Sequence, residues 1–457
     1  MRKYEEYKDS GIEWIGEVPE EWEMYKIKYL INNYKAGPFG SSLITSNLLS
    51  DGNILVYTPE HIANMTTNLS NNLYLPNERK EEMSQFLVRH GDLIFPIVGS
   101  LGRAMFISDE MPEGIINQRL AKFRLKENLV DKNFFIYYFT KCNLVKEYID
   151  VNSRGAIIVN LTKDIVTSMY IPLPPLSAQQ SIASFLDAKT KPIDDIISKR
   201  EKQIELLEEM KSAIISHAVT KGLNPDAKMK DSGIEWIGEI PEHWTICKFR
   251  RVIDVLTDFT ANGSFGDLAK NVKYLSEPDY SRLVRLTDLR LNIDNEDGVW
   301  LDETSHNYLK KSELFGGELL MANVGAYAGY TCIMPHKKII ATLGPNMYLI
   351  RVNNNVAIQK FMNYLLGSKP YFSWLQMLAN ASAQPKINKD TVKSLSVCIP
   401  ESIEEQERII SYLDTKTSKL DARIAKRRRQ IELLQEYKQA LITDAVTGKI
   451  DVRGFNS

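Results

Sequence analysis

The chain has 457 residues, 44% of them hydrophobic and 25% charged, and its formal net charge is −1. At about 150 residues per domain, this length excludes a single core and predicts two to four domains. The near-zero charge excludes a general affinity for nucleic acid, so any DNA binding must come from local basic patches.

The sequence shows no sign of export or of a membrane span. Its polar start is unlike a signal peptide, and it has no run of about 18 apolar residues. The 4 cysteines lack the CxxC spacing of a zinc site and are too scattered for a disulfide framework. These features predict a cytoplasmic protein in a reducing environment.

A tandem repeat organises the chain. The opening stretch KDSGIEWIGEVPEEW, at 8–22, returns almost unchanged as KDSGIEWIGEIPEHW at 230–244. Further matches follow in the same order, namely GPFGSS (37–42) with GSFGDL (263–268), TKDIV (162–166) with NKDTV (388–392), and KREKQIELLEEMKSAIISHAVT (199–220) with KRRRQIELLQEYKQALITDAVT (426–447). The sequence therefore predicts a duplicated unit.

Between the matching stretches, each copy has a diverged interior, roughly 45–160 and 270–385. Segments such as GDLIFPIVGSLGRAMFI and GGELLMANVGAYAGYTCIM predict short strands broken by Gly and Pro. One helix is expected per interior, at 132–150 and 357–379, because apolar and aromatic residues recur there at helical steps. Each interior is thus predicted to be a β-rich α+β domain.

A long helix is predicted after each interior, because apolar residues recur at steps of 3 and 4, the period of a coiled coil. They are Ile193, Ile197, Ile204, Leu207, Ile214 and Ala218 in the first helix, and Leu420, Ile424, Ile431, Leu434, Leu441 and Ala445 in the second. Pro192 suits the start of the first helix, and Gly222 and Pro225 suit its end. The two apolar stripes most simply pair with each other.

These patterns divide the chain into a first domain (1–175), a helical segment (176–222), a linker (223–229), a second domain (230–402) and a second helical segment (403–450). Motifs of catalysis are missing from all five parts. The sequence has no GxxxxGK[ST] phosphate loop, no dinucleotide or methyl-donor glycine turn, and no pair of histidines at metal-ligand spacing. We therefore expect no catalytic site and no metal in this chain.

The ordered frame resembles the specificity subunits of type I restriction–modification systems. DSGIEWIGEIPEHW opens a unit, IPLPPLSAQQ or IPESIEEQ closes it, and a long helix with QIELL follows. The resemblance covers nearly the whole chain. It implies two target recognition domains joined by an antiparallel, pseudo-two-fold helical spacer, and a DNA-recognition role without catalysis. Each half would read one half-site of an asymmetric bipartite target.

The same resemblance implies the partners. Two methyltransferase subunits would bring S-adenosylmethionine, and two motor–nuclease subunits using ATP and Mg²⁺ are expected only in some complexes. The helices, roughly 40–45 Å long at 1.5 Å per residue, would hold the recognition domains about one DNA turn apart. This spacing predicts a gap of about five to eight unread base pairs.

DNA contacts need cationic, amide or hydroxyl side chains in loops. The candidates in the first half are Ser41, Ser42, Arg79, Lys80, Arg89, Arg103, Arg119, Arg154 and Gly155. Those in the second half are Arg282, Arg285, Arg290, Lys310, Lys311, Asn346, Gln384 and Lys386. Arg154–Gly155 and Gln384–Lys386 rank highest because they occupy the same place in both halves. Each of these side chains could instead be a solvated surface group, and Arg119 could belong to the fold.

Partner contacts are expected on the outer faces of the long helices, at Met210, Ile215 and Tyr437, unless these residues belong to the seam between the helices. Two other functions remain open. The first is the recognition part of a fused methyltransferase–nuclease, and the second is a two-module scaffold that binds protein or glycan. The repeated Trp14, Trp22, Trp236 and Trp244 are interpreted as buried anchors and not as DNA readers.

Overall fold

The computed structural model describes residues 2–39, 43–98, 102–152, 161–291, 298–336, 339–380 and 385–455, without the side chains of 290 and 291. The chain forms two compact units. Unit 1 comprises Met1–Glu201 and Arg429–Ser457, and unit 2 comprises Lys202–Arg428. Both boundaries fall inside long helices, so each unit contains one diverged interior and a segment of both helices.

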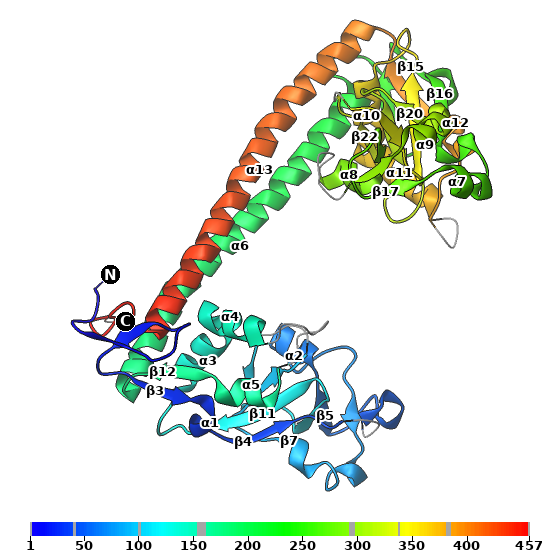
Figure 1. The fold of residues 1–457 in the computed structure, drawn as a ribbon. Coiled ribbons are helices and arrows are strands. Elements are labelled where there is room, and N and C mark those ends of the chain that lie inside the picture. Colours follow the sequence, from blue (N-terminus) through cyan, green and yellow to red (C-terminus); the bar gives the residue numbers. More distant parts are fainter. Residues whose placement is uncertain are drawn as a thin grey trace. The chain divides into compact units, whose positions relative to one another are not determined.

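The regular elements of unit 1 surround two four-stranded sheets (Figure 1). Its strands are β1 (Tyr7–Asp9), β2 (Glu17–Pro19), β3 (Glu23–Lys26), β4 (Ile31–Ala36), β5 (Ile54–Tyr57), β6 (Tyr74–Leu75), β7 (Leu87–Val88), β8 (Asp92–Pro96), β9 (Met105–Phe106), β10 (Gly114–Ile116), β11 (Leu120–Leu125) and β12 (Tyr170–Leu173). Its helices are α1 (Ile27–Leu30), α2 (Pro59–Asn64), α3 (Lys132–Lys141), α4 (Asn143–Asn152) and α5 (Lys163–Ser168).

Unit 2 repeats this plan with one more strand. Its strands are β13 (Met229–Asp231), β14 (Glu239–Pro241), β15 (Trp244–Lys248), β16 (Ile253–Asp258), β17 (Tyr274–Leu275), β18 (Ser281–Val284), β19 (Val299–Leu301), β20 (Glu313–Leu314), β21 (Leu319–Ala322), β22 (Thr331–Ile333), β23 (Ala341–Leu343), β24 (Met347–Val352) and β25 (Ser396–Pro400). Its helices are α7 (Phe265–Asn271), α8 (Leu286–Leu291), α9 (Glu303–Tyr308), α10 (Gln359–Gly367), α11 (Lys369–Ala379) and α12 (Lys389–Ser394).

The central sheet has the same strand order in both units. Strands run β4-β11-β8-β9 in unit 1 and β16-β24-β21-β22 in unit 2. The second sheet runs β6-β5-β10-β7 in unit 1 and β17-β19-β18-β23-β20 in unit 2, where β19 is the added strand. In both second sheets one pair of strands is parallel, β5 with β10 and β18 with β23. The predicted duplicated α+β fold is therefore confirmed.

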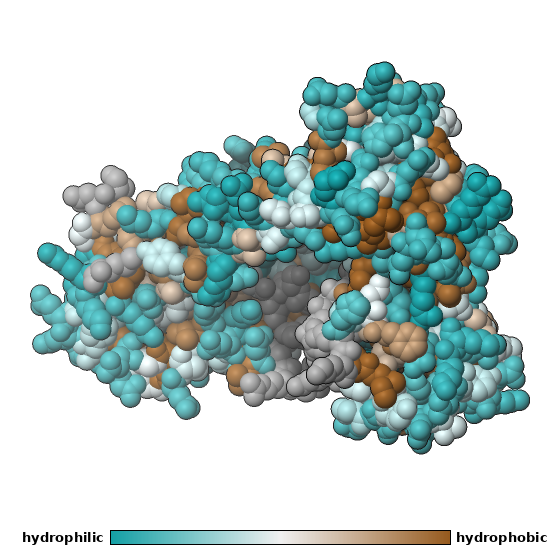
Figure 2. Space-filling model, turned by 90° about the horizontal axis from the view of Figure 1, so that it is seen from above, coloured by the Kyte–Doolittle hydropathy of each residue, from teal (hydrophilic) through white to brown (hydrophobic). Residues whose placement is uncertain are grey.

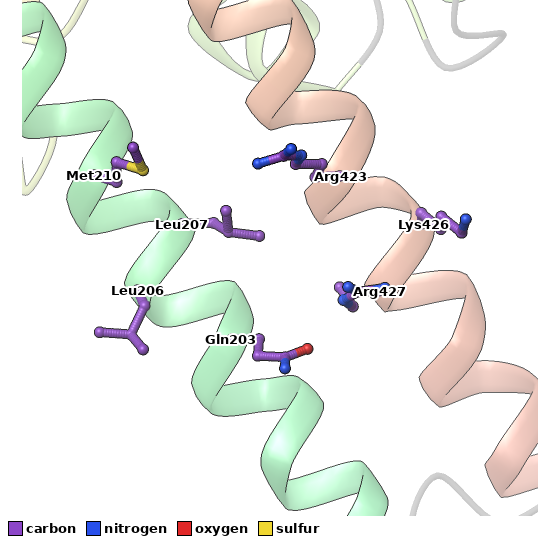
Figure 3. Close-up of a pocket in the computed structure, with 7 residues that line it drawn as sticks. All are labelled: Gln203, Leu206, Leu207, Met210, Arg423, Lys426 and Arg427. Atoms are coloured by element: carbon purple, nitrogen blue, oxygen red, sulfur yellow. The ribbon is translucent and has the colours of Figure 1, made fainter.

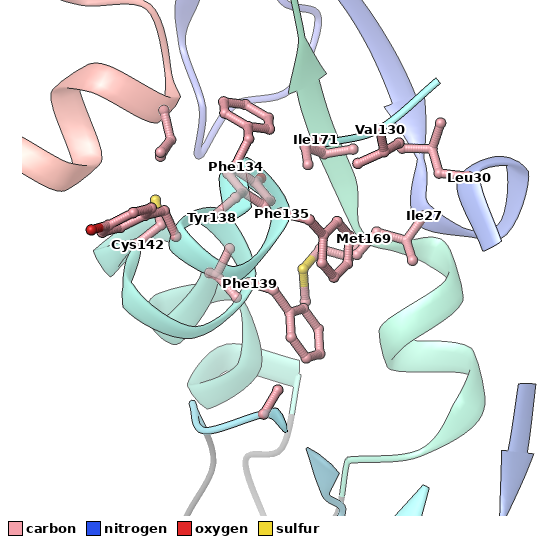
Figure 4. Packing of buried hydrophobic residues seen from close by; sticks show 14 of the residues in the cluster. Ile27, Leu30, Val130, Phe134, Phe135, Tyr138, Phe139, Cys142, Met169 and Ile171 are labelled. Atoms are coloured by element: carbon pink, nitrogen blue, oxygen red, sulfur yellow. The ribbon is translucent and has the colours of Figure 1, made fainter. Parts of the chain in front are cut away.

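An aromatic core lies between the central sheet of unit 1 and its helices. Phe95 and Phe123, on β8 and β11, have ring centroids 5.3 Å apart, and Phe139 of α3 meets Phe95 edge-on at 5.4 Å. Figure 4 shows Phe135 and Phe139 of α3 on the same side of the helix as Met169. Such edge-to-face pairs stabilise the core beyond the burial of apolar area alone. They fix the central sheet against helix α3.

Two long helices run from one unit into the other, α6 (Leu176–Lys221) and α13 (Ile403–Val446). They lie side by side within each unit (Figure 1). In unit 2, Glu208 pairs with Arg428 and Lys211 with Asp421, at 2.9 and 2.7 Å. Residue numbers rise along one helix as they fall along the other, so the pair is antiparallel, as expected. All twelve predicted seam positions are buried or half-buried.

Helix α6 begins at Leu176, so the prediction that Pro192 starts the helix was wrong. A proline inside a helix removes one N–H from the hydrogen-bond ladder, usually at a cost of about 3 kcal/mol or more. The helix passes through this point because the turns before Pro192 are packed. Ile182 and Leu186 are both fully buried in the core of unit 1. Tertiary packing here overrides the local stop signal.

Each interior contains two consecutive helices where one was predicted, so that prediction was also wrong. Between α3 and α4, Cys142 is extended, with φ −80° and ψ 128°. The N–H of Asn143, which opens α4, donates to Thr443 Oγ1 of α13 at 3.1 Å. A hydrogen bond to the long helix thus replaces the backbone hydrogen bond that a continuous helix would form here. The periodicity of the sequence does not reveal this break.

The break in unit 2 has the same origin. Ser368 is extended between α10 and α11, and the N–H of Lys369 donates to Ser216 Oγ of α6 at 3.3 Å. Pro370 follows in the first turn of α11, where a missing N–H costs nothing. In both units, therefore, the interior is docked on the C-terminal part of a long helix through the same backbone N–H.

The tryptophans of the repeated opening phrase are anchors. Trp22 and Trp244 are 1% and 0% exposed, and Trp14 and Trp236 are half-buried. A side-chain atom added at Gly448, just after α13, would lie 3.2 Å from the Trp22 ring. Each phrase is thus fixed at the C-terminal end of a long helix, which defines where its domain begins.

Candidate nucleic-acid interface

Loops gather at one edge of the central sheet in unit 1. The turn after β4 approaches the turn before β11, where the N–H of Gly37 donates to Leu120 O at 2.8 Å. A Cβ at Gly37 would lie 1.9 Å from Asn117 O, so only glycine allows this approach. Leu161 is tied to the same edge, because its N–H donates to Ile97 O at 2.8 Å. We call residues 37–39 and 117–119 the loop edge of unit 1.

Arg119 is the exposed cation of this edge. It immediately precedes β11, and its N–H donates to Asn117 Oδ1 at 3.0 Å, which shapes the turn. Its side chain lines a hollow of ≈ 480 Å³ together with Gln118, Thr58 and Glu60. A guanidinium on a rigid turn beside a hollow is suited to meet a base edge or a phosphate.

Unit 2 builds a corresponding loop edge from residues 259–265, 344–346 and 385–386. Asn346 precedes β24 as Arg119 precedes β11, and it is exposed with φ 65°. Its carbonyl accepts from the N–H of Asn323 at 3.1 Å. Lys386 forms a bridge with Val324, which pins its loop to the end of β21. Asparagine tolerates the left-handed conformation better than most residues, so it suits this turn.

The loop edge of unit 2 encloses a polar hollow of ≈ 380 Å³. Its lining includes Asn346, Lys386, Asn323, Tyr348 and Asp258. Asn323 is 7% exposed, and its Oδ1 has no hydrogen-bond partner among the residues that the structure describes. Burial raises the pKa of Tyr348, so the phenol stays protonated at neutral pH and donates to Ile387 O at 2.9 Å.

Four other predicted DNA contacts of unit 1 lie away from the loop edge, and three of them have protein partners for their side chains. Arg79 pairs with Glu82 at 3.1 Å and Lys80 with Glu113 at 2.8 Å, and these carboxylates offset their charge. Arg103 donates to Ala63 O at 2.6 Å. Arg89 is exposed before β8. Among the predicted cations of unit 1 that the structure describes, Arg119 is therefore the one that stands at the loop edge.

Arg282 belongs to the interior of unit 2. It is 2% exposed, lies 3.4 Å from Asp288, and stacks over the Trp300 ring at 5.3 Å. A Cβ at Gly298 would overlap its guanidinium, at 1.2 Å from Nη1. Packing of this kind stabilises a buried charge, and it does not present the charge to a ligand.

Arg285 shares the carboxylate of Asp288, with Nη2 2.8 Å from Oδ1. Burial alone would raise the pKa of Asp288, but hydrogen bonds from Arg285 and the nearby charges hold it below its ordinary value. Lys310 and Lys311 are exposed. Lys311 donates to Ala261 O at 3.2 Å, which places it beside the loop edge of unit 2.

The remaining predicted contacts lie outside the described residues. They are Ser41, Ser42, Arg154, Gly155 and Gln384, together with the side chain of Arg290. Three residues were not predicted, namely Phe39 and Phe265 at the loop edges and Asn323 in the hollow of unit 2. The signal for the two phenylalanines was present, because GPFG and GSFG are matching parts of the repeat.

All four cysteines are free. Burial raises the pKa of Cys332 to about 12 and that of Cys398 to about 11, and it also raises the pKa of Cys142 and Cys247. Neutral thiols of this kind are poor nucleophiles. Among the described residues, His, Cys, Asp and Glu side chains form no group of three that could hold a metal ion.

Comparison with known proteins explains this combination of a shared frame and divergent loop edges. The family model described as "Type I restriction modification DNA specificity domain" matches residues 19–206 and 284–433, which is more than half of the chain. The chain belongs to this family. It is a non-catalytic DNA-recognition subunit of a type I restriction–modification system, with two specificity domains.

Relatives of this specificity subunit extend over its whole length. The "Type I restriction enzyme MjaVIII specificity subunit" of Methanocaldococcus jannaschii is 25% identical, covering 96% of this chain and 95% of the relative. The "Type I restriction enzyme EcoBI specificity subunit" of Escherichia coli is 21% identical, covering 79% and 73%. None of these matches supports the scaffold for protein or glycan.

A solved structure shows the same fold. It is described as "Structural basis underlying complex assembly and conformational transition of the type I R-M system", and its matching chain has a TM-score of 0.67 at 15% identity. The match covers 95% of the specificity subunit and 99% of that chain. Among the helices that the structure describes, none combines the length and hydropathy needed to cross a membrane.

Exposure to solvent separates the three predicted partner contacts on the long helices. The face shown in Figure 2 is mainly hydrophilic, with hydrophobic side chains in separate patches. On the long helices, Met210 and Tyr437 are 53% and 52% exposed, so both lie outside the seam. Ile215 is half-buried and packs against the core of unit 2. The structure therefore separates Ile215 from the other two predicted contacts.

A hollow of ≈ 490 Å³ opens beside Met210 in unit 2, between α6 and α13. Figure 3 shows Leu207 pointing towards α13 and Arg427 pointing towards α6, whereas Leu206 and Lys426 point away from the facing helix. Leu206 is 55% exposed. This hollow combines an apolar floor from α6 with a basic rim from α13.

Proposed function

We propose that each unit of this specificity subunit reads one half-site of an asymmetric bipartite DNA target through its loop edge. The observation that carries the proposal is the pair Arg119 and Asn346. These residues occupy the same turn in two units that share one frame, yet they offer different hydrogen-bonding groups. Arginine favours guanine, through O6 and N7, and asparagine favours adenine, through N6 and N7. The two half-sites should therefore differ.

The test starts from the methylation pattern of host DNA, sequenced with and without the gene for this chain. A bipartite methylated motif that disappears on deletion supports the proposal and gives the target and its gap. Retention of every methylated motif contradicts it.

The second step assigns the units to the half-sites. Arg119→Ala should relax one position of one half-site, and Asn346→Ala one position of the other, each by about 1–3 kcal/mol. Arg429→Ala is the charge-matched control, because Arg429 lies on α13 and pairs with Glu432. Equal losses at both half-sites from either variant would contradict separate reading.

We propose further that two methyltransferase subunits dock on the long helices, at the sites marked by Met210 and Tyr437. These residues occupy matching positions of the repeat, in ELLEEMK and ELLQEYK, and both are half exposed. An exposed apolar side chain at matching positions suits two copies of the same partner. Those subunits would bring S-adenosylmethionine, and motor–nuclease subunits, where present, would use ATP and Mg²⁺.

Light scattering of the co-expressed complex tests this stoichiometry. We expect two methyltransferase subunits per chain, and we expect Met210→Asp to leave one, because an aspartate would place a charge in an apolar contact. Ile215→Ser, at a position turned into the core of unit 2, serves as the comparison. A complex with one methyltransferase subunit in the wild type would rule out the two-site arrangement.

The long helices are also proposed to set the gap between the half-sites. The chain passes between the units only within α6 and α13. Insertion of one helical turn into both, about 5.4 Å of added length, should lengthen the unread gap by one or two base pairs at 3.4 Å each. An unchanged gap in the methylated motif would contradict the proposal.

A further inference from the structure

Two phenylalanines at matching places of the repeat are strongly exposed. Phe39, in GPFG, is 78% exposed, and Phe265, in GSFG, is 77% exposed. A single exposed apolar side chain is common on protein surfaces. Two at the same place of a duplicated unit are more informative, because the shared tryptophans of the frame are buried (Trp22 and Trp244) or half-buried (Trp14 and Trp236).

Close contacts fix the position of both turns. Gly37 touches the backbone of Asn117, which places the turn of Phe39 next to the turn that carries Arg119. In unit 2, Ser264 caps helix α7: its Oγ accepts from the N–H of Asp267 at 3.3 Å and donates to Asp267 Oδ2 at 2.6 Å. Phe265 is thus held by a capped turn, and Phe39 comes two residues after Gly37, which is held against Asn117.

The surroundings of Phe265 indicate what it meets. It lines the same hollow as Asn346 and Lys386. This arrangement places an aromatic ring, an amide suited to a base edge and a cation suited to a phosphate around one space. Proteins that bind DNA combine these three groups in this way, with apolar side chains inserted at base steps.

The contrast between shared and divergent residues assigns the role. The residue before the matching strands β11 and β24 is Arg119 in unit 1 and Asn346 in unit 2. Residues that read different half-sites must differ in this way. The phenylalanine is the same in both, so its ligand must be common to both half-sites. The faces of stacked bases meet this condition, because every base presents a similar aromatic surface.

We propose that Phe39 and Phe265 are aromatic wedges that contact the bases of each half-site without reading their sequence. This inference rests on the proposed function of the loop edges, and it adds a second, sequence-independent kind of contact. The wedges would stabilise the complex on any duplex, while Arg119 and Asn346 would select the target.

The experiment uses the complex of this chain with its methyltransferase subunits and measures Kd for target and non-target duplexes at several salt concentrations. Phe265→Ala and Phe39→Ala should each weaken binding about 10- to 100-fold on both duplexes, as loss of a stacked base contact does. The ratio between the two duplexes and the salt dependence should stay unchanged. Phe265→Leu should retain part of the affinity, because leucine can also act as a wedge.

Two variants provide matched controls. Phe315→Ala removes another phenylalanine of unit 2, which is 66% exposed and lies against Arg351, and it should leave Kd unchanged. Lys386→Ala should weaken both duplexes and lower the salt slope by about one, as expected for a phosphate contact.

Three results would overturn the inference. If both phenylalanine variants bound DNA with the wild-type Kd while Arg119→Ala and Asn346→Ala kept their effects, the phenylalanines would not be wedges. The proposed function would still hold. Loss of methyltransferase subunits from the variants in size-exclusion chromatography would make the phenylalanines protein contacts. A loss confined to the target duplex would make them sequence readers. If Arg119→Ala and Asn346→Ala were silent as well, the proposed function itself would fail.

Discussion

Units 1 and 2 share the hydrogen bonds of a buried glutamine in each long helix and differ in what they present at their loop edges. Gln179 of α6 accepts from the N–H of Asp131 at 2.8 Å and donates to Leu129 O and Pro174 O, both at 2.9 Å. Gln406 of α13 makes the same three contacts in unit 2. The duplicated frame has therefore kept its hydrogen bonds as well as its sequence.

The loop edges show the opposite behaviour. Unit 2 inserts a short helical turn, Phe259–Asn262, between β16 and its exposed phenylalanine. Ile97 of unit 1 corresponds to Asn323 of unit 2, so an apolar side chain stands where the polar hollow has a buried amide. Contacts between each domain and the long helices thus tolerate little change, whereas the loop edge of the sheet is free to diverge.

The buried glutamines should give the largest effect. Gln179→Leu and Gln406→Leu each leave three backbone groups without a partner, at about 1–3 kcal/mol per group. We expect the free energy of unfolding of the affected unit to fall by roughly 3–9 kcal/mol, and by the same amount in both cases. Hydrogen exchange measured for each unit tests this. Unequal losses would break the equivalence of the frames.

The glycines at the start of the two loop edges should differ. Gly37→Ala would force a Cβ against Asn117 O, and overpacking against backbone costs about 1–3 kcal/mol. Gly263→Ala would meet the hydroxyl of Tyr308, 2.6 Å away at the end of a side chain that can move, so its effect should be smaller. Methylation of each half-site reports the result, and a larger effect from Gly263→Ala would contradict this ranking.

One contact belongs to unit 2 alone. Glu405 accepts from Trp244 Nε1 at 3.0 Å, and the residue at the matching place in unit 1 is Ala178. Glu405→Ala should therefore destabilise unit 2 by about 1–2 kcal/mol, because the buried indole N–H loses its acceptor. Exchange protection should stay constant in unit 1. A fall in both units would show that the frames are coupled.

The ion pairs between the helices should matter least. Asp194 pairs with Lys438 at 2.6 Å and Asp421 with Lys211 at 2.7 Å, and these are matching positions of the repeat. Because both pairs are partly exposed, a double-mutant cycle should give about 0.2–1 kcal/mol for each. The coupling should be equal in the two pairs and weaker in high salt. A coupling above this range in one pair alone would mark a difference between the two helical segments.

Much of the frame could be predicted because its signals are local or periodic. The seam positions follow from apolar spacing, and the burial of Trp22 and Trp244 follows from an apolar ring in a repeated phrase. The helix breaks at Cys142 and Ser368 could not be predicted, because contacts with the long helices cause them. The continuation of α6 through Pro192 likewise depends on packing.

The loop edges were less accessible to sequence reasoning. In the sequence, Arg282 and Arg119 are equally good candidates for a DNA contact. Only the fold shows that Arg282 faces Asp288 and Trp300 inside unit 2. Asn323 became notable because β21 buries it beside a hollow, which no local pattern encodes. In the sequence, Phe39 and Phe265 belong to a predicted turn, and their exposure follows only from the fold.

The ion pairs of the helices also bear on how such a chain arose. Asp194 of the first copy pairs with Lys438 of the second copy. The matching aspartate of the second copy, Asp421, pairs with the matching lysine of the first copy, Lys211. This reciprocity is the mark of a symmetric dimer interface. The helix contacts are therefore those expected if two copies of one gene were joined in a single chain. Once joined, each copy could acquire its own loop edge, which a symmetric dimer cannot do.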